Sequence, residues 1–335
     1  MSVRDAFRGQ AASCDALGSP FMARLMELCA DRLQPGTPVA DRIFGWTGDP
    51  SSNADNVPLR LAGALHALKL KGIALVDVYP PNDVDEHSLW DAIQGAMTDH
   101  ASAILSWLDN APQTNEVRRA AAILPALALL KSRFERPVEL LELGTSGGLN
   151  LRADRFRLNL PGGYIGSRDA SVILTPEWHG PMPPGVLPDI ARRAGVDLAP
   201  LDPSLPDDEL RLLAYLWADQ PDRIARTRAA ISVARTLPAK ISAGDAGAWL
   251  EQQLSAPNPD HLRVVLHTIA WQYFPPETKA RAEAAMNAAD GPLARIAMEY
   301  DGGKGAGVSL TTWPGGQSQE IARADFHGRW VRWTP

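Results

Sequence analysis

One segment of the chain combines a carboxylate with a run of small residues. Residues Glu142–Asn150 (ELGTSGGLN) follow the apolar run Val138–Leu143, which has the pattern of a strand buried on both faces. Small residues let a backbone approach a ligand closely, and a helix starting there offers unpaired N–H groups and a partial positive charge. A carboxylate beside a fixed cation stabilises it by a charge-assisted hydrogen bond. The segment is therefore a candidate binding turn.

Two phosphate-binding patterns do not fit this turn. A dinucleotide fingerprint, G-x-G-x-x-G, counted from Gly144 would need glycine at Ser146 and Leu149. A P-loop, G-x-x-x-x-G-K-[ST], would need glycine and lysine at Leu149 and Asn150. The segment 302–305 (GGKG) has neither the spacing nor the following Ser or Thr.

The remaining pattern, acidic-x-Gly-x-small-x-Gly, resembles the first motif of class I S-adenosylmethionine-dependent methyltransferases, with Ser146 replacing the usual middle glycine. This resemblance implies that the turn passes under the methionine part of the cofactor and that the carboxylate binds its ammonium group. The alternative is an ordinary glycine-rich strand–helix turn of an α/β protein. The residues of the turn expected to bind S-adenosylmethionine are Glu142, Gly144, Thr145, Ser146, Gly148 and Asn150.

The same resemblance implies two further cofactor contacts. Asp245 and Ala246 follow a short predicted strand, 240–243, and would lie beside the adenine. The ribose hydroxyls need an acidic residue after the second strand. Asp202, which follows the predicted strand 196–201, is the first candidate, and Glu177 is its rival.

Catalytic candidates follow the clearest predicted strand, 262–269. His267 lies at its end, where open α/β sheets place their sites, and could act as a general base near neutral pH. It could equally be a hydrogen-bonded core histidine. Gln272 and Tyr273 come on the next loop, where Tyr273 would bind substrate or pack under Phe274.

Polar residues before the first predicted strand could cover the cleft and contact the substrate, or could form a helix cap at Thr114 or Asn115. These substrate candidates are Gln113, Asn115, Glu116 and Arg118. Neither the seven histidines nor the two cysteines have metal-ligand spacing, so we expect no metal.

The elements that position these residues form two expected domains. Residues 1–135 carry long helical patterns, at 19–33, 59–70, 84–108 and 115–133, and would shape the substrate pocket. From residue 136 to 335, strands alternate with helices, which predicts an α/β fold with a Rossmann-like methyltransferase sheet. We expect an inserted hairpin near 161–180, a helix at 187–194 and a helical stretch at 207–235 broken near 219–221. The strand-rich end, with strands at 293–299, 308–313 and 328–333, predicts an antiparallel edge.

Composition narrows the possible classes. The 335 residues are 45% hydrophobic and 21% charged, as in globular proteins. A net charge of −6 disfavours nucleic acid as the partner. No apolar run is long enough to span a bilayer, and Met1–Gln10 has no secretory apolar region. We therefore expect a cytoplasmic protein without a membrane partner; the sequence does not indicate an oligomeric state.

Several phrases together are similar to one prokaryotic family, domain of unknown function 2332 (DUF2332). The resemblance runs from about residue 19 to 333 and implies a shared fold and site, but no reaction. The phrases include residues 113–119 (QTNEVRR), 217–220 (WADQ), 244–246 (GDA), 267–273 (HTIAWQY) and 327–330 (HGRW).

Two functions remain open from the sequence. The first is an S-adenosylmethionine-dependent methyltransferase acting on a small molecule, with positioning and desolvation supplying most of the rate. The second is a non-catalytic or repurposed Rossmann-like domain that binds a nucleoside-like ligand or a protein partner, because fold does not fix function.

Overall fold

The computed structural model describes residues 1–335, and the chain divides into two units that are each discontinuous in sequence. Unit 1 contains Met1–Thr114 and Leu205–Ala225, and unit 2 contains Asn115–Ser204 and Arg226–Pro335. Helix α9 (Pro221–Thr236) begins in unit 1 and ends in unit 2. This division differs from the expected boundary at residue 135, because a long helix before that residue belongs to the sheet-containing unit.

Unit 1 is helical, as its apolar periods predict. The pattern at 84–108 forms two helices that meet at His100. The side chains of Ser2, Thr37, Asn56 and Asp85 cap the helices that follow them. The helices of this unit, besides the start of α9, are α1 (Val3–Ala16), α2 (Pro20–Arg32), α3 (Pro38–Phe44), α4 (Val57–Leu70), α5 (Glu86–Asp99), α6 (Ala101–Leu108) and α8 (Pro206–Ala214).

The second segment of unit 1 completes its core. Trp217 and Ala218 are buried in the same cluster as the apolar residues of α2 and α4. The carboxylate of Asp219 accepts hydrogen bonds from the Ser19 hydroxyl and from the Phe21 N–H, the latter at 3.0 Å, and thereby caps α2. The phrase 217–220 is thus structural within this unit, and the expected helix break near 219–221 is confirmed between α8 and α9.

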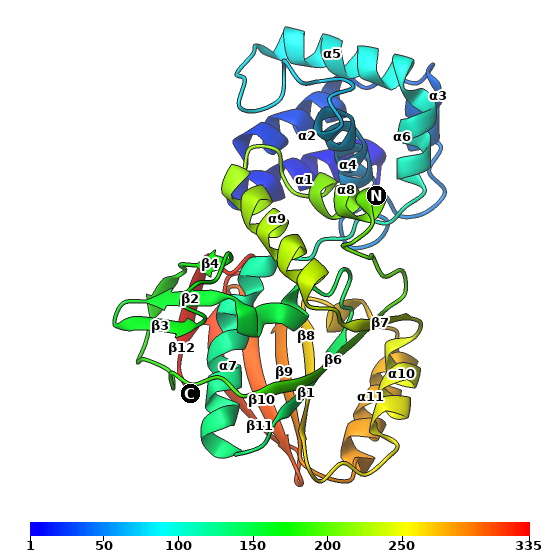
Figure 1. Cartoon of the computed structure of the whole chain (residues 1–335). Helices are drawn as coiled ribbons and strands as arrows, with labels where there is room; N and C mark the ends of the chain where they lie inside the picture. Colours follow the sequence, from blue (N-terminus) through cyan, green and yellow to red (C-terminus); the bar gives the residue numbers. More distant parts are fainter. The chain divides into compact units, whose positions relative to one another are not determined.

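Unit 2 is built on a nine-stranded sheet of order β5-β12-β11-β10-β9-β8-β1-β6-β7 (Figure 1). Five neighbouring strands run parallel: β7 (Lys240–Ala243), β6 (Ile190–Asp197), β1 (Val138–Leu143), β8 (Leu262–Thr268) and β9 (Leu293–Tyr300). The chain passes from β1 to β6 and β7 on one side, then returns to β8 and β9 on the other. The direction of chain progress therefore reverses at β1, the place where open α/β sheets bind ligands.

The end of the sheet is antiparallel, as predicted. Strands β10 (Ala306–Trp313), β11 (Gln317–Ala324) and β12 (Trp330–Trp333) follow β9 as a meander, and β11 was not predicted. Strand β5 (Glu177–His179) pairs with β12 in parallel and forms the last edge.

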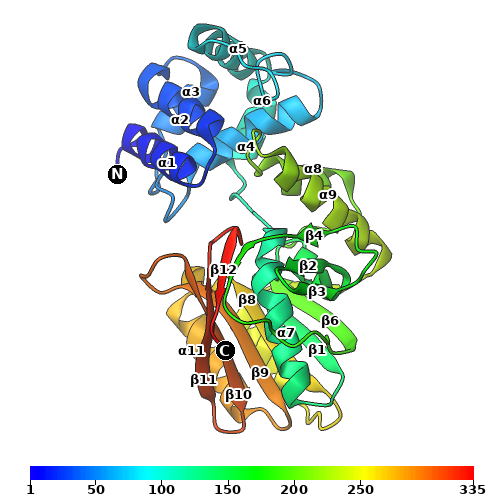
Figure 2. The same cartoon turned by 90° about the vertical axis from the view of Figure 1, so that its left-hand side faces the viewer.

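Helices cover both faces of the sheet (Figures 1 and 2). Helix α7 (Ala120–Arg133) lies on one face, whereas α10 (Ala246–Leu254) and α11 (Pro276–Ala288) lie on the other. The apolar side chains of α10 and α11 pack against residues of β1, β6 and β8, in a core that includes Leu141, Val196 and Val265. The mixed α/β architecture expected after residue 136 is therefore present.

Two details differ from the sequence-based expectation. Instead of a hairpin at 161–180, strands β2 (Arg157–Leu160), β3 (Gly163–Gly166) and β4 (Ile173–Leu174) form a separate small sheet with β2 in its centre. The predicted helix 187–194 and strand 196–201 are wrong, because residues 190–197 form β6.

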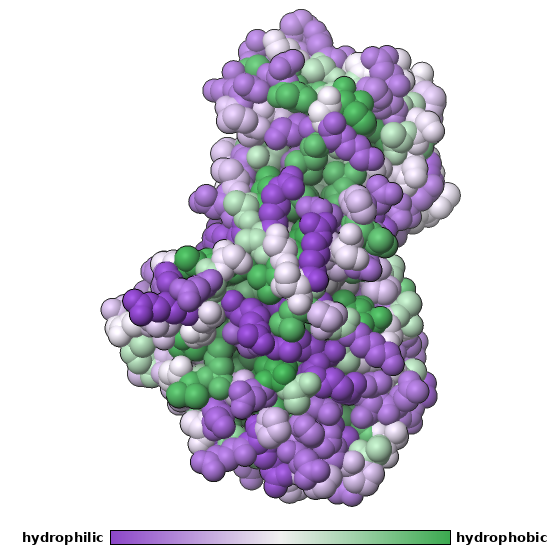
Figure 3. Space-filling view, in the orientation of Figure 1, coloured by the Kyte–Doolittle hydropathy of each residue, from purple (hydrophilic) through white to green (hydrophobic).

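Short 3-10 helices follow three loops of unit 2: η1 (Val117–Arg119), η2 (Leu149–Arg155) and η3 (Trp271–Tyr273). The face of unit 2 seen in Figure 3 is largely hydrophilic, with smaller apolar patches between. None of the helices has the length and apolar character required to cross a bilayer.

Candidate functional site

The glycine-rich turn connects β1 to η2 and is anchored on β6. Gly144, Ser146 and Gly148 all have left-handed backbones, with φ of 68°, 51° and 64°. This conformation is uncommon for serine. The N–H groups of Gly144 and Thr145 both donate to the Val196 carbonyl, at 2.9 and 3.1 Å. The turn is therefore held to the neighbouring strand by backbone hydrogen bonds.

Residues expected to bind substrate instead support the far side of the turn. The Asn115 Oδ1 accepts a 2.8 Å hydrogen bond from the Leu149 N–H, at the start of η2. The Asn150 side-chain amide donates to the Glu116 carbonyl at 3.2 Å. Asn115 thus acts as a cap, although for η2 and not for the helix that follows it in sequence. Gln113 lies at the end of unit 1, just before the boundary between the units.

Two glycines of the turn make room for the protein's own side chains. A Cβ atom added at Gly144 would lie 2.6 Å from the Ala270 Cβ, and one at Gly148 would lie 2.6 Å from the Ile241 Cδ1. Both contacts are closer than packed carbon atoms allow. Internal packing is therefore sufficient to explain why these two positions are glycine, without invoking a ligand.

Two other residues of the turn have buried polar atoms without partners. The Ser146 Oγ and the Asn150 Oδ1 make no hydrogen bond, and their residues are only 6% and 1% exposed. Such atoms are rare in folded proteins and mark places where a ligand or an ordered water supplies the missing bond. They are the strongest sign of a binding function at this turn.

Glu142 is a buried carboxyl group at the end of β1. Its Oε2 accepts a 2.6 Å hydrogen bond from the Thr145 hydroxyl. Burial raises the pKa of Glu142 to about 8, and this effect outweighs the opposing hydrogen bond and the charges of Arg152 and Arg119. The group is therefore mainly protonated at neutral pH, and a cation bound beside it would favour the ionised form.

The acidic residue at the end of the second parallel strand is Asp197. Its carboxylate accepts hydrogen bonds from the N–H groups of Ser146, at 2.8 Å, and Ala199, at 3.0 Å. Asp202, expected at this place, lies beyond the end of β6, where its Oδ1 accepts from the N–H and hydroxyl of Ser204. Glu177 lies in β5, at the opposite edge of the sheet. Asp197 was missed because the strand had been predicted further along the chain.

Asp245 caps helix α10. Its Oδ1 accepts from the Ala248 N–H at 2.8 Å, and its Oδ2 accepts from the Thr278 hydroxyl of α11. Partial burial would raise the pKa of Asp245, but the hydrogen bonds from Thr278 and Ala248 lower it. Both carboxylate oxygens thus have a structural role, while Ala246 forms the first residue of α10.

His267 is fully buried and has both ring nitrogens engaged. The Arg295 Nε donates to its Nε2 at 2.8 Å, which places the ring proton on Nδ1, 2.7 Å from the Glu299 Oε1. Trp271 stacks on the imidazole with ring centroids 5.0 Å apart. Burial lowers the pKa of His267. In this arrangement His267 is neutral and bonded within the protein, which fits the hydrogen-bonded core histidine offered above as the alternative to a general base.

The residues after His267 lie at the carboxyl end of β8. Gln272 and Tyr273 are both exposed on η3. The alternative in which Tyr273 packs under Phe274 is not observed. Trp271 packs on Phe274 instead, with 5.7 Å between the ring centroids. Gln272 and Tyr273 therefore remain available to a ligand at this edge of the sheet.

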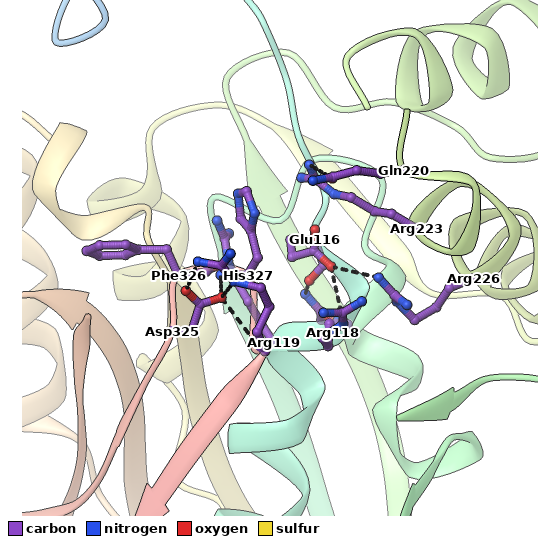
Figure 4. Close-up of polar contacts among 11 residues, drawn as sticks. Glu116, Arg118, Arg119, Gln220, Arg223, Arg226, Asp325, Phe326 and His327 are labelled. Carbon is purple, nitrogen blue, oxygen red and sulfur yellow. Dashed lines mark hydrogen bonds and ion pairs between the residues drawn. The ribbon is translucent and has the colours of Figure 1, made fainter. Parts of the chain in front are cut away.

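Arg119 bonds to two segments that are distant in sequence, and Figure 4 shows it beside one of them, residues 325–327. Its Nε donates to the Phe326 carbonyl at 3.0 Å, and its Nη1 donates to the Thr268 carbonyl at the end of β8 at 3.1 Å. Beside it, the Glu116 Oε1 accepts from the Arg118 N–H at 3.0 Å. The phrases 113–119, 267–273 and 327–330 thus meet at the carboxyl end of the parallel strands.

Nearly the whole chain matches one family model. The family is described as an uncharacterised protein conserved in bacteria (DUF2332), and the match covers residues 4–333. The chain belongs to the DUF2332 family. No curated protein matches this DUF2332 chain. Family membership therefore accounts for the distinctive phrases, whereas a reaction has to be argued from the site.

Proposed function

We propose that unit 2 of this DUF2332 protein is a Rossmann-like domain that binds S-adenosylmethionine at the turn after β1, and that the protein transfers the methyl group to a small molecule. The observation that carries the proposal is the 2.8 Å hydrogen bond between the Ser146 N–H and the Asp197 carboxylate. It joins a glycine-rich turn to a strand-end carboxylate at the reversal point of a parallel sheet. Open α/β folds that bind a nucleoside cofactor use this combination.

The proposed contacts assign one group to each part of the cofactor. Asp197 takes the ribose hydroxyls, the role expected of Asp202 or Glu177, because it is the acidic residue at the end of the second parallel strand and is bonded to the turn at Ser146. Glu142 faces the ammonium group of the methionine part. The unpaired Ser146 Oγ and Asn150 Oδ1 supply the remaining polar contacts. Ala246 at the start of α10 offers a backbone N–H to the adenine.

The cofactor supplies an electrophilic methyl group, so the protein has to position the acceptor and exclude water. Gln272 and Tyr273, exposed after the end of β8, are the proposed substrate contacts. Arg118 is a third, because its neighbour Arg119 is bonded to the Thr268 carbonyl at the end of the same strand. His267 serves as a positioning residue, because its ring nitrogens are bonded to Arg295 and Glu299.

Calorimetric titration of the full chain with S-adenosylmethionine and S-adenosylhomocysteine tests the proposal. We expect Asp197→Asn to weaken binding by about tenfold or more, equivalent to about 1.4 kcal/mol. Asp202→Asn is the matched control and should bind as the wild type does. If neither compound binds the folded wild-type protein, the proposal is wrong.

A second measurement reports on Glu142 alone. Because the pKa of Glu142 is raised to about 8, binding a cation beside it at pH 7 should release a proton. Titrations in two buffers of different ionisation enthalpy measure that release. Glu142→Gln should abolish it, and an equal release from this variant would exclude Glu142 as the group facing the charge.

One observation favours a second function, nucleoside binding without methyl transfer. Ala270 and Ile241 occupy the space beside Gly144 and Gly148, which limits how closely a methionine chain approaches the turn. Titration with adenosine separates the two functions. Equal affinity for adenosine and S-adenosylhomocysteine would favour the second function, and clearly tighter binding of S-adenosylhomocysteine would favour the first.

A further inference from the structure

Unit 2 has a cavity of about 440 Å³ that the proposed cofactor contacts do not line. It lies beside the edge strand β7, between the loop that follows β6 and the end of α9. Its walls are about equally polar and apolar, and their apolar part includes Leu201, Pro203, Ala234, Pro238 and Ile241. The volume is within the range of small-molecule sites. Glu142, Ser146 and Asp197 are not among its lining residues.

One buried charge, Arg152, faces this cavity. The residue is only 3% exposed. Its Nε donates to the Leu237 carbonyl at 3.0 Å and its Nη1 to the Gly148 carbonyl at 2.6 Å. The third nitrogen, Nη2, makes no hydrogen bond within the protein. Because Arg152 lines the cavity, an anion bound there can accept a charge-assisted hydrogen bond from this nitrogen.

The other charged residues limit the charge of the ligand. Arg235 and Asp202 lie at the more exposed side of the cavity. With Arg152 they give two positive charges and one negative charge, a net charge of one positive unit. A monoanion matches this balance, whereas a dianion such as a phosphate monoester would be repelled by Asp202. The apolar part of the wall, which includes Leu201, Pro238 and Ile241, favours an apolar body for the rest of the ligand.

We propose that this cavity binds a small monocarboxylic acid, with its carboxylate on the Nη2 of Arg152 and its apolar body against Leu201, Pro238 and Ile241. The site is separate from the proposed cofactor site, although Arg152 touches the same turn through the Gly148 carbonyl. The two proposals can therefore fail independently.

The test is calorimetric titration of the full chain with acetate, butyrate and benzoate, and with benzamide as the neutral match for benzoate. We expect benzoate or butyrate to bind better than acetate, because they fill more of the apolar space. Benzamide should bind about tenfold more weakly than benzoate, which corresponds to about 1.4 kcal/mol. Saturating S-adenosylhomocysteine should leave benzoate binding unchanged.

Two variants locate the site. Arg152→Met removes the charge together with two internal hydrogen bonds, so its binding is informative only if the variant is folded. Ala239→Trp fills the cavity from its wall and keeps Arg152. Ala284→Trp, on the exposed face of α11, is the matched control. We expect Ala239→Trp to abolish carboxylate binding and Ala284→Trp to retain it.

Four results would each overturn the inference. They are no binding of any of the three carboxylates to the wild type, equal binding of benzamide and benzoate, unchanged binding by folded Ala239→Trp, and displacement of benzoate by S-adenosylhomocysteine. The last result would make the cavity a part of the nucleoside site.

Discussion

The hydroxyl of Thr145 lies 2.6 Å from the carboxyl group of Glu142, in the buried interior at the end of β1. The two residues belong to the same turn, so the chain supplies a partner for its own buried acid. That single neutral partner does not offset the loss of hydration, and the pKa of Glu142 is raised to about 8. The stability of the protein should therefore depend on pH through this group.

The first prediction compares the wild type with Glu142→Gln by urea unfolding between pH 4.5 and 8. A carboxyl whose pKa rises on folding, here from 4.5 to about 8, stabilises the folded state fully below the lower value. That stabilisation is lost as the pH rises through the higher value. The wild type should thus lose a few kcal/mol relative to the variant, since one pKa unit is about 1.4 kcal/mol. Parallel stability curves for the two proteins would contradict this prediction.

The second prediction concerns the contact between Gly144 and Ala270. Gly144→Ala should destabilise unit 2 by roughly 2–5 kcal/mol, combining about 1–2 kcal/mol for the left-handed backbone with about 1–3 kcal/mol for overpacking. Gly302→Ala, also at positive φ but with open space around its Cβ, should show only the backbone cost. Adding Ala270→Gly to Gly144→Ala should restore part of the loss. Strictly additive effects in this double-mutant cycle would show that the two residues do not clash.

A third prediction concerns the protonation of His267. Because Arg295 donates to Nε2 and Glu299 accepts from Nδ1, the imidazole should stay neutral with its proton on Nδ1. Burial lowers the pKa of His267, so the unfolded chain takes up a proton below about pH 6.5 that the folded protein does not. This group therefore reduces stability as the pH falls. Nitrogen-15 NMR of the ring checks the tautomer between pH 6 and 8, and a charged imidazole in that range would show the hydrogen-bond assignment to be wrong.

The fourth prediction tests whether Asp245 is a helix cap or a cofactor ligand. Asp245→Ala should lower the free energy of unfolding by about 1–2 kcal/mol, because the caps of α10 and the Thr278 contact are lost. Asp245→Asn keeps an acceptor for the Ala248 N–H and should lose less. Binding of S-adenosylhomocysteine by Asp245→Asn should match the wild type if the carboxylate is only structural. A selective loss of binding in this folded variant would instead assign Asp245 to the adenine.

Apolar sequence patterns were sufficient to predict strands and helices that are buried against apolar side chains. Strand β8 is buried at every position, and its run of aliphatic residues made it evident. Strand β6 was misplaced because Arg192 and Arg193 interrupt its pattern. In the structure these arginines reach Gln253, at 2.9–3.0 Å, and Asp154, at 2.5 Å, and such partners are not visible in a local sequence window.

The sequence was sufficient to locate the candidate turn, but not to predict its hydrogen bonds. The turn at 142–150 follows a parallel strand, as expected. The roles of Asn115 and His267 depend on Leu149, Arg295 and Glu299, which are distant in sequence and meet only in the folded sheet. Asp197 could not be predicted either, because its position at a strand end depends on the correct placement of β6.

Residues 205–225 belong to unit 1 but are synthesised after 90 residues of unit 2, and this order constrains how the protein folds during translation. The His66 imidazole meets the Ala214 carbonyl at 3.1 Å, Trp217 is buried in the helical core, and Asp219 caps α2. A ribosome releases residues 1–114 long before these groups exist. The N-terminal helices must therefore wait, with part of their core uncovered, while some ninety residues of the other unit emerge. A gene cut after residue 114 would leave that intermediate as its final product.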